Sequence, residues 1–160
     1  TNWESHLEHV HKVLTVLTLN CFYVQKKKCS FGKRKIDYLG HVVSLEGVEM
    51  DQNKVEAVIH WPIPRSVKAV RGFLGLTGYY RRFIKNYGMI AKPLTDLLKK
   101  DGYQWNEKNL KAFNELITAV TTTPVLALPD FSKQFCIECD VSGKGLGVVL
   151  FQEKRPIAFF

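Results

Sequence analysis

The sequence predicts an α+β fold in which helices and short antiparallel strands occupy separate stretches of the chain. Apolar residues recur at helical spacing over residues 2–17 and again over 66–84. Strand-like runs joined by a turn lie between residues 36 and 50, and an alternation of apolar and polar residues begins at Phe135. These observations place a helical middle region between two regions that contain strands.

The composition is that of a chain with a buried core. With 46% hydrophobic and 12% aromatic residues among 160, disorder is excluded as the main state. No run of eighteen apolar residues is present, so we expect no membrane partner and an intracellular location. The chain has no initiating Met, and its last residues, PIAFF, resemble an interrupted strand. We therefore expect a fragment of a longer protein.

The basic charge is confined to the first part of the chain. The net charge is +8; residues 1–100 contain 17 Lys and Arg against 8 Asp and Glu, a balance of +9, whereas residues 101–160 contain 6 against 7, a balance of −1. Such an uneven basic balance indicates a polyanion partner, of which nucleic acid is the commonest. A solubilising surface explains the charge equally well.

The first fifty residues are predicted to contain one helix and several strands. Residues 2–17 form the helix, with Asn2 as its N-cap. The run CFYVQ is strand-like and leads into the basic stretch KKKCSFGKRK. A hairpin follows in which residues 36–44 pair with residues 48–50 across a Glu-Gly turn.

Helices dominate the middle of the chain. Asp51 and Ser66 are the expected N-caps of the first two, and the motif WPIP separates them because proline restricts the residue before it. The predicted helices cover residues 53–60, 66–84, 90–100 and 107–121. After PVLALP the pattern changes to the strands FCIECD, LGVVLFQ and PIAFF, the first two joined by the turn SGKG.

The helix over 66–84 contains three glycines, Gly72, Gly75 and Gly78, although each costs a helix about 1 kcal/mol relative to alanine. One side of this helix is an apolar stripe that should face a core, made of Val67, Val70, Phe73, Leu74, Thr77, Tyr80 and Ile84.

The opposite side of the same helix is basic at both ends and bare in the middle. It carries Lys68, Arg71, Gly75, Tyr79 and Arg82, with Gly72 and Gly78 beside them. Such a face can bring the backbone close to a grooved partner, with arginines on phosphates and the tyrosine against a sugar or base. Close helix–helix packing explains the glycines equally well, although a cationic face is unusual inside a protein.

Several motifs closely resemble the pol polyprotein of gypsy-type LTR retrotransposons. They are YLGH, WPIP, RGFLGLTGYYRRFI, PLTDLLKK and ECDVSGKGLGVVL, and they follow the family order along essentially the whole chain. The resemblance implies part of an RNA-directed DNA polymerase with ribonuclease H, a nucleotidyltransferase. It divides the chain into the end of the reverse transcriptase palm with a primer-grip β-hairpin (1–50), a helical thumb (51–127) and the first antiparallel strands of an RNase H-like domain (128–160).

The resemblance also implies roles for particular residues. Tyr38, Leu39, Gly40 and His41 match the primer-grip hairpin, which holds the primer 3′ end. The 66–84 helix matches the thumb helix that follows the minor groove, so Arg71, Gly75, Tyr79 and Arg82 are its expected contacts with nucleic acid. The implied partners are an RNA–DNA hybrid, a DNA duplex and the rest of the polyprotein, in the cytoplasm (virus-like particle) or the nucleus.

Catalysis is not expected from these 160 residues alone. The Y-x-D-D motif of the family lies upstream, and two-metal chemistry with Mg²⁺ requires clustered carboxylates. Asp140 matches the first metal-binding aspartate of ribonuclease H and is the one catalytic candidate. Cys139, Val141 and Val149 depart from the usual pattern around it, which hints at a decayed copy. A structural connection module, in which the aspartate has no metal role, is the alternative.

Two functions remain open from the sequence. The first is a reverse transcriptase fragment that grips the template–primer duplex. The second is a decayed or domesticated remnant of a retroelement that acts as a non-enzymatic module binding nucleic acid or protein.

Overall fold

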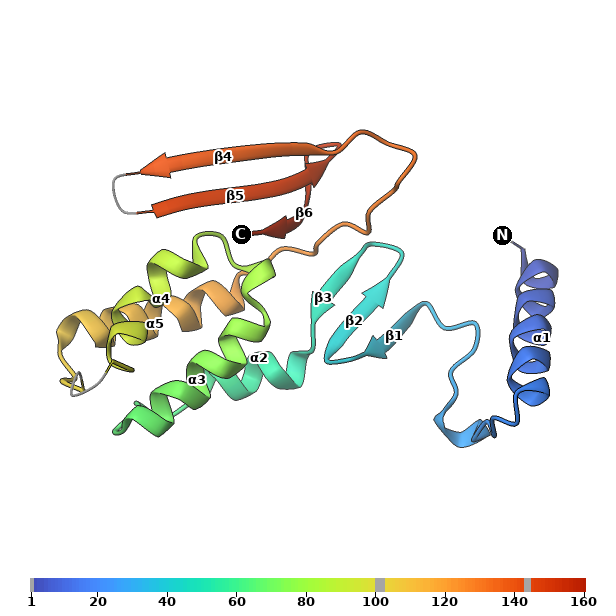
Figure 1. The fold of residues 1–160 in the computed structure, drawn as a ribbon, viewed down its shortest axis with the longest axis horizontal. Coiled ribbons are helices and arrows are strands. Elements are labelled where there is room, and N and C mark those ends of the chain that lie inside the picture. Colours follow the sequence, from blue (N-terminus) through green and yellow to red (C-terminus); the bar gives the residue numbers. More distant parts are fainter. Residues whose placement is uncertain (1, 100–102, 143–144) are drawn as a thin grey trace. The chain divides into compact units, whose positions relative to one another are not determined.

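The structure is a computed structural model that describes residues 2–99, 103–142 and 145–160. It divides into two compact units, residues 1–36 and 37–160. Figure 1 labels the helices and strands along the chain. Among the described residues, no helix combines the length and the apolar character needed to cross a membrane.

The first unit consists of one helix and the segment that follows it. Helix α1 (Trp3–Leu19) begins at Asn2, whose side chain accepts a hydrogen bond from the Ser5 N–H at 2.8 Å, so the predicted N-cap is confirmed. The prediction of a strand in CFYVQ is wrong, because residues 22–25 have no regular structure. A single 3-10 turn follows at Lys26–Lys28.

A small antiparallel sheet has the strand order β1-β2-β3. Its strands are β1 (Lys35–Tyr38), β2 (His41–Ser44) and β3 (Val48–Met50). Residues 36–44, predicted as one strand, are thus two strands with a tight turn between them. The predicted Glu-Gly turn is confirmed between β2 and β3, where Gly47 has φ 137° and a Cβ would lie 2.0 Å from the Leu126 carbonyl oxygen.

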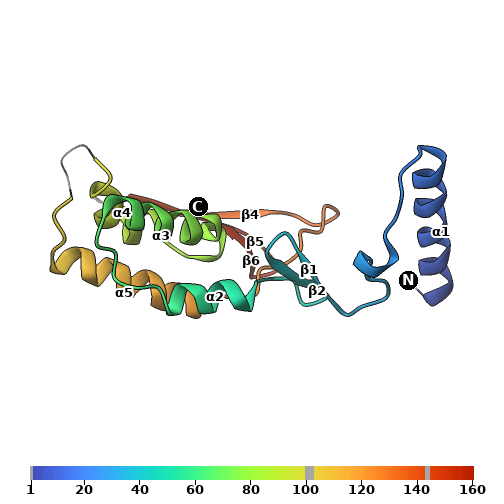
Figure 2. The same cartoon turned by 90° about the horizontal axis from the view of Figure 1, so that it is seen from below.

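Four helices form the core of the second unit, visible from below in Figure 2. They are α2 (Gln52–Ile59), α3 (Val67–Tyr79), α4 (Tyr87–Asp96) and α5 (Glu107–Thr121). The predicted stripe of α3 faces this core: Val70, Phe73, Thr77 and Tyr80 are at most 1% exposed. The caps Asp51 and Ser66 are also confirmed by hydrogen bonds to backbone N–H groups.

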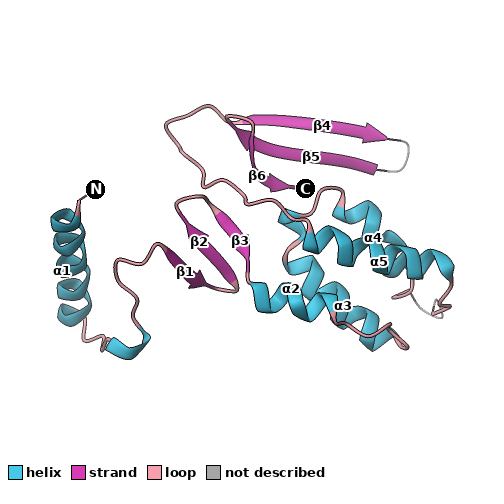
Figure 3. Ribbon diagram, turned by 180° about the vertical axis from the view of Figure 1, so that it is seen from behind, coloured by secondary structure: helices cyan, strands magenta, loops and turns pink. Residues whose placement is uncertain are grey.

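A second antiparallel sheet, coloured magenta with the first in Figure 3, has the order β4-β5-β6. Its strands are β4 (Cys136–Ser142), β5 (Gly145–Gln152) and β6 (Arg155–Phe159). An isolated bridge joins Leu126, which precedes this sheet, to Val48 of β3, with N–O distances of 2.8 and 3.0 Å. The α+β fold class is therefore confirmed.

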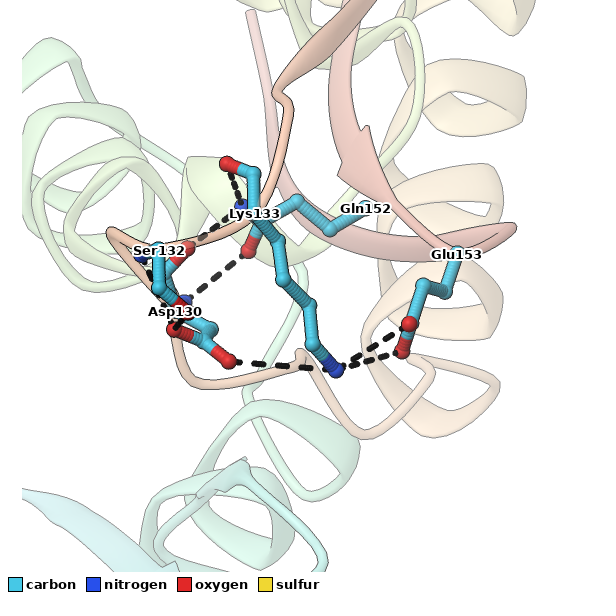
Figure 4. A network of polar contacts seen from close by, with 5 residues as sticks. All are labelled: Asp130, Ser132, Lys133, Gln152 and Glu153. Carbon is cyan, nitrogen blue, oxygen red and sulfur yellow. Dashed lines mark hydrogen bonds and ion pairs between the residues drawn. The ribbon is translucent and has the colours of Figure 1, made fainter.

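The loop before β4 is fixed by one buried side chain, Gln152 at the end of β5 (Figure 4). Its Nε2 donates to the carbonyl oxygens of Asp130 and Lys133 at 2.8 and 3.1 Å, and its Oε1 accepts from the Asp130 N–H at 2.9 Å. Lys133 pairs with Glu153 at 3.0 Å on the exposed side. These contacts fix the loop to the second sheet.

Candidate functional site

The turn between β1 and β2 consists of Leu39 and Gly40, here called the hairpin tip. Their φ angles are 48° and 75°. Two-residue hairpins favour turns in which both central residues have positive φ, which glycine and asparagine adopt easily and leucine does not. The Leu39 side chain is nevertheless 72% exposed, so no burial in this chain compensates for the strained backbone.

The carbonyl oxygen of Leu39 accepts two hydrogen bonds. The Tyr79 hydroxyl, at the end of α3, donates one at 2.7 Å. The ring Nδ1 of His41 lies 3.0 Å from the same oxygen, and because a carbonyl can only accept, His41 carries its proton on Nδ1. Both lone pairs of this carbonyl are therefore occupied.

The carbonyl oxygen of Gly40 also accepts two hydrogen bonds. The Tyr80 hydroxyl donates to it at 2.6 Å, and the Asp51 N–H, at the start of α2, donates at 3.2 Å. A Cβ on Gly40 would lie 3.1 Å from the Tyr80 oxygen, so this close approach suits glycine. One carbonyl thus connects the hairpin tip with the ends of two helices.

The residues that make these hydrogen bonds belong to an aromatic cluster. The His41 ring lies 5.4–5.6 Å, centroid to centroid, from the rings of Tyr79, Tyr80 and Phe83. Burial, followed by the charge of Asp51, raises the pKa of Tyr80 to about 12. The Tyr80 hydroxyl is therefore neutral, and able to donate, throughout the physiological pH range.

The outer side of α3 continues from the hairpin tip. Arg71, Gly75 and Tyr79 follow one another at intervals of four residues and are all exposed, so they line one face of the helix, here called the α3 face. A Cβ on Gly75 would have no heavy atom within 4 Å. No packing within the described structure accounts for a glycine at this position.

The other two helix glycines have neighbours. A Cβ on Gly72 would lie 3.4 Å from the Trp61 ring, and one on Gly78 would lie 3.3 Å from the Tyr87 hydroxyl. The contact at Gly78 is tight, which agrees with the packing alternative, whereas a Cβ on Gly72 would make an ordinary van der Waals contact and Gly75 stays open to a partner.

The helix is shorter than the sequence suggested. It ends at Tyr79, and Arg81–Phe83 form a 3-10 turn, so the predicted helix over 66–84 is wrong in its last turn. Arg82 is exposed on that turn, and helical spacing no longer assigns it to the α3 face. Tyr38, 64% exposed, lies on β1 directly before the hairpin tip.

Asp140 lies on β4, opposite Gly147 of β5. Gly147 also approaches Asn86, whose Oδ1 would be 2.6 Å from a Cβ on this glycine. A cavity of about 210 Å³ between the segment before α4 and the second sheet is lined by Lys85, Asn86, Glu138, Cys139, Asp140, Gly147, Val148 and Val149. The fold thereby brings Asp140 toward the segment that precedes α4.

The carboxylates described here do not fit a two-magnesium site. Asp140 and Glu138 both line the cavity, but two-metal chemistry needs several clustered carboxylates. Among the described residues, no group of three or more His, Cys, Asp or Glu side chains is close enough to hold a metal ion.

Sequence reasoning missed the role of Tyr80. Helical spacing assigned it to the core stripe, and it is indeed 1% exposed, but its hydroxyl reaches the hairpin tip. The pair YY directly before RRF was the available signal, because a tyrosine inside a core needs a partner for its hydroxyl.

Relatives match the whole chain at the sequence level. A family profile described as "RNase H-like domain found in reverse transcriptase" matches residues 105–160. An uncharacterized mitochondrial protein of Arabidopsis thaliana is 52% identical over 131 residues, which are 81% of this chain and 83% of that protein. The Pol polyproteins from transposons 297 and gypsy of Drosophila melanogaster are 42% and 38% identical, over 99% and 98% of this chain. The chain spans only 15% and 16% of their lengths.

Solved structures share the fold. The foamy viral protease–reverse transcriptase dRH in complex with ds DNA matches 99% of this chain with a TM-score of 0.89 and 22% identity, over 29% of its own length. The same viral enzyme in complex with an RNA/DNA hybrid matches 99% with a TM-score of 0.87 and 22% identity, over 22% of its length. The α+β arrangement of this chain is that of these proteins.

Proposed function

Because this chain belongs to the Pol polyproteins of gypsy-type retrotransposons, in the region from the C-terminal part of the reverse transcriptase into the RNase H-like domain, we propose that it grips a template–primer duplex. The hairpin tip and the α3 face together form the binding surface. The chain contributes the grip and not the chemistry of polymerisation.

One observation carries this proposal. The hydrogen bond from the Tyr79 hydroxyl to the Leu39 carbonyl oxygen brings the hairpin tip to the end of the α3 face. Two segments that the family resemblance assigns separately to duplex binding therefore lie together. The viral relatives of the same fold were solved with double-stranded DNA and with an RNA/DNA hybrid, which supports the same class of ligand.

The chemistry of the surface suits a duplex of any sequence. Arg71 on the α3 face and the exposed Arg82 on the 3-10 turn after α3 offer guanidinium groups to phosphates, and Gly75 lets the helix backbone approach a groove. Leu39 and the Tyr79 ring, 72% and 54% exposed, offer apolar contact to sugars. Nothing in this set reads base edges, so shape and backbone recognition are expected. Tyr38, Gly40 and His41 form and support the hairpin tip.

The division of labour along the chain is part of the proposal. Residues 1–50 are the palm end with the primer grip, 51–127 the thumb, and 128–160 the start of the RNase H-like domain. Polymerase and ribonuclease H activity with Mg²⁺ belongs to a longer parent protein, in which Asp140 is the first RNase H carboxylate. The nucleic-acid partners are then the RNA–DNA hybrid and the DNA duplex.

The proposal is tested by titrating the 160-residue chain into labelled probes of one sequence: a DNA duplex, an RNA–DNA hybrid and a DNA single strand. Fluorescence anisotropy should show binding to both duplexes, with affinities that fall as salt rises. A second, unrelated sequence should bind equally well. Binding to the single strand alone, or no binding at low salt, contradicts the proposal.

A second candidate function is a free-standing binding module without catalysis. The Arabidopsis relative supports it, because the 131 matched residues are 83% of that protein, so a relative of this chain is far shorter than the polyproteins, of which the chain spans only 15% and 16%. Both candidates predict that the chain with Mg²⁺ neither extends a primer nor cleaves a hybrid. Detection of either activity in a pure preparation would contradict both.

A further inference from the structure

We propose that the hydroxyl groups of Tyr79 and Tyr80, here called the tyrosine pair, are positioning groups that hold the Leu39 side chain outward for contact with the duplex. This inference rests on the proposed function and adds to it a device that fixes the geometry of the binding surface. The tyrosine pair acts through the hairpin tip and needs no contact of its own with the duplex through these hydroxyls.

The hydrogen bonds assign this role. The hairpin tip has two carbonyl oxygens, and each accepts from one tyrosine, at 2.7 Å for Leu39 and 2.6 Å for Gly40. Both tyrosines come from the end of α3, 40 residues later in the chain. The turn is therefore fixed to a helix of the core and not only to its own strands.

The hairpin tip needs such external support. Leu39 has φ 48°, a conformation that costs a non-glycine residue free energy, and its side chain is exposed and makes no compensating core contact. Tyr80 supplies rigidity, because its ring is 1% exposed and contacts the rings of His41 and Phe83. Strain that the surroundings maintain at an exposed apolar residue is typical of a functional contact.

The consequence is preorganisation. Without the tyrosine pair, the hairpin tip can relax to other turn conformations, and only a fraction of molecules present Leu39 correctly. The apparent association constant is then the intrinsic constant multiplied by that fraction, although every residue that touches the duplex is still present.

The experiment compares the wild-type chain with Tyr79→Phe/Tyr80→Phe, which removes only the two hydroxyls. The matched control is Tyr87→Phe, which removes a partly buried hydroxyl that bonds to Thr77 and Leu74 and not to the hairpin tip. Anisotropy with a DNA duplex should show an affinity loss on the order of fivefold for the double variant and none for the control. Thermal unfolding confirms that each variant is folded; if the double variant unfolds, Tyr79→Phe alone, with its half-exposed ring, replaces it.

The decisive comparison adds Leu39→Ala. If the tyrosine pair acts through Leu39, its removal causes no further loss in the Leu39→Ala background, while Arg71→Ala causes its full loss in both backgrounds. An equal further loss in the Leu39→Ala background, or a loss in Tyr87→Phe as large as in the double variant, overturns the positioning role. If Leu39→Ala and Arg71→Ala both bind like the wild type, the proposed function itself fails.

Discussion

The Tyr79 hydroxyl donates a 2.7 Å hydrogen bond to the carbonyl oxygen of Leu39, and the two residues are separated by 40 positions in the sequence. This contact joins two features. One is a hairpin with a strained turn, and the other is a helix whose outer face lacks a side chain at Gly75. Neither feature stabilises the folded chain, and both lie on one surface. Their combination is the reason to assign this surface to a ligand.

Replacing the strained leucine should separate stability from binding. Leu39→Gly relieves the positive φ and should raise the free energy of unfolding by about 1 kcal/mol, while duplex affinity falls because the apolar contact is lost. Lys154→Gly, at φ 63° in the turn between β5 and β6, is the matched control and should raise stability without changing affinity. Urea unfolding and anisotropy measure the two effects. Unchanged affinity in Leu39→Gly would remove Leu39 from the binding surface.

A substitution at Gly75 should also separate the effect on stability from the effect on duplex binding. Gly75→Ala adds a methyl group that meets no atom within 4 Å, so stability should rise by up to about 1 kcal/mol. Duplex affinity should fall several-fold because the methyl group keeps the backbone from the groove. Gly88→Ala on α4 also has open space and should leave affinity unchanged. If Gly75→Ala binds as tightly as the wild type, no close backbone approach occurs there.

Alkaline pH should weaken the fold through Tyr80. Its pKa is raised from 10.0 to about 12 in the folded state, chiefly by burial. Because the folded-state pKa exceeds the unfolded value, this contribution to stability is complete below pH 10.0 and is lost as the pH rises toward 12. The unfolding free energy of Tyr80→Phe should therefore depend less steeply on pH across this range. Equal pH dependence in both proteins would show that Tyr80 titrates normally.

Removal of the Gln152 side-chain amide should destabilise the second sheet. Gln152→Leu leaves three backbone groups of the loop before β4 without their partner, at a cost of about 2 to 3 kcal/mol. Lys133→Ala removes only exposed ion pairs of the same network and should cost less than about 1 kcal/mol. Urea unfolding compares them, and equal costs would mean that Gln152 does not fix the loop.

Local chemistry made much of the fold predictable. Asn2, Asp51 and Ser66 were identified as caps because a side chain and a nearby N–H decide that role. Helix α5 and the Glu-Gly turn followed from periodicity and turn residues in the same way. The run CFYVQ failed as a strand because strand propensity alone does not supply a pairing partner.

The structure of the site was less predictable because distant contacts create it. A leucine at positive φ opposes every local preference, and it is stabilised by hydroxyls far along the chain. The end of α3 at Tyr79 was also missed, since neither a proline nor a glycine directly follows it. The residue identities at the hairpin tip were named from the family resemblance, and their arrangement came from the structure.

The salt dependence of duplex binding tests the central claim most directly. Anisotropy titrations of the wild type, of Arg71→Ala/Arg82→Ala and of the control Lys111→Ala on α5 should be repeated from low to physiological salt with a DNA duplex. If the two arginines grip phosphates, the double variant binds more weakly and its slope of log affinity against log salt is smaller by about 2, whereas the control slope is unchanged. An unchanged slope in the double variant would contradict the account, because the two arginines would then make no contact with phosphates.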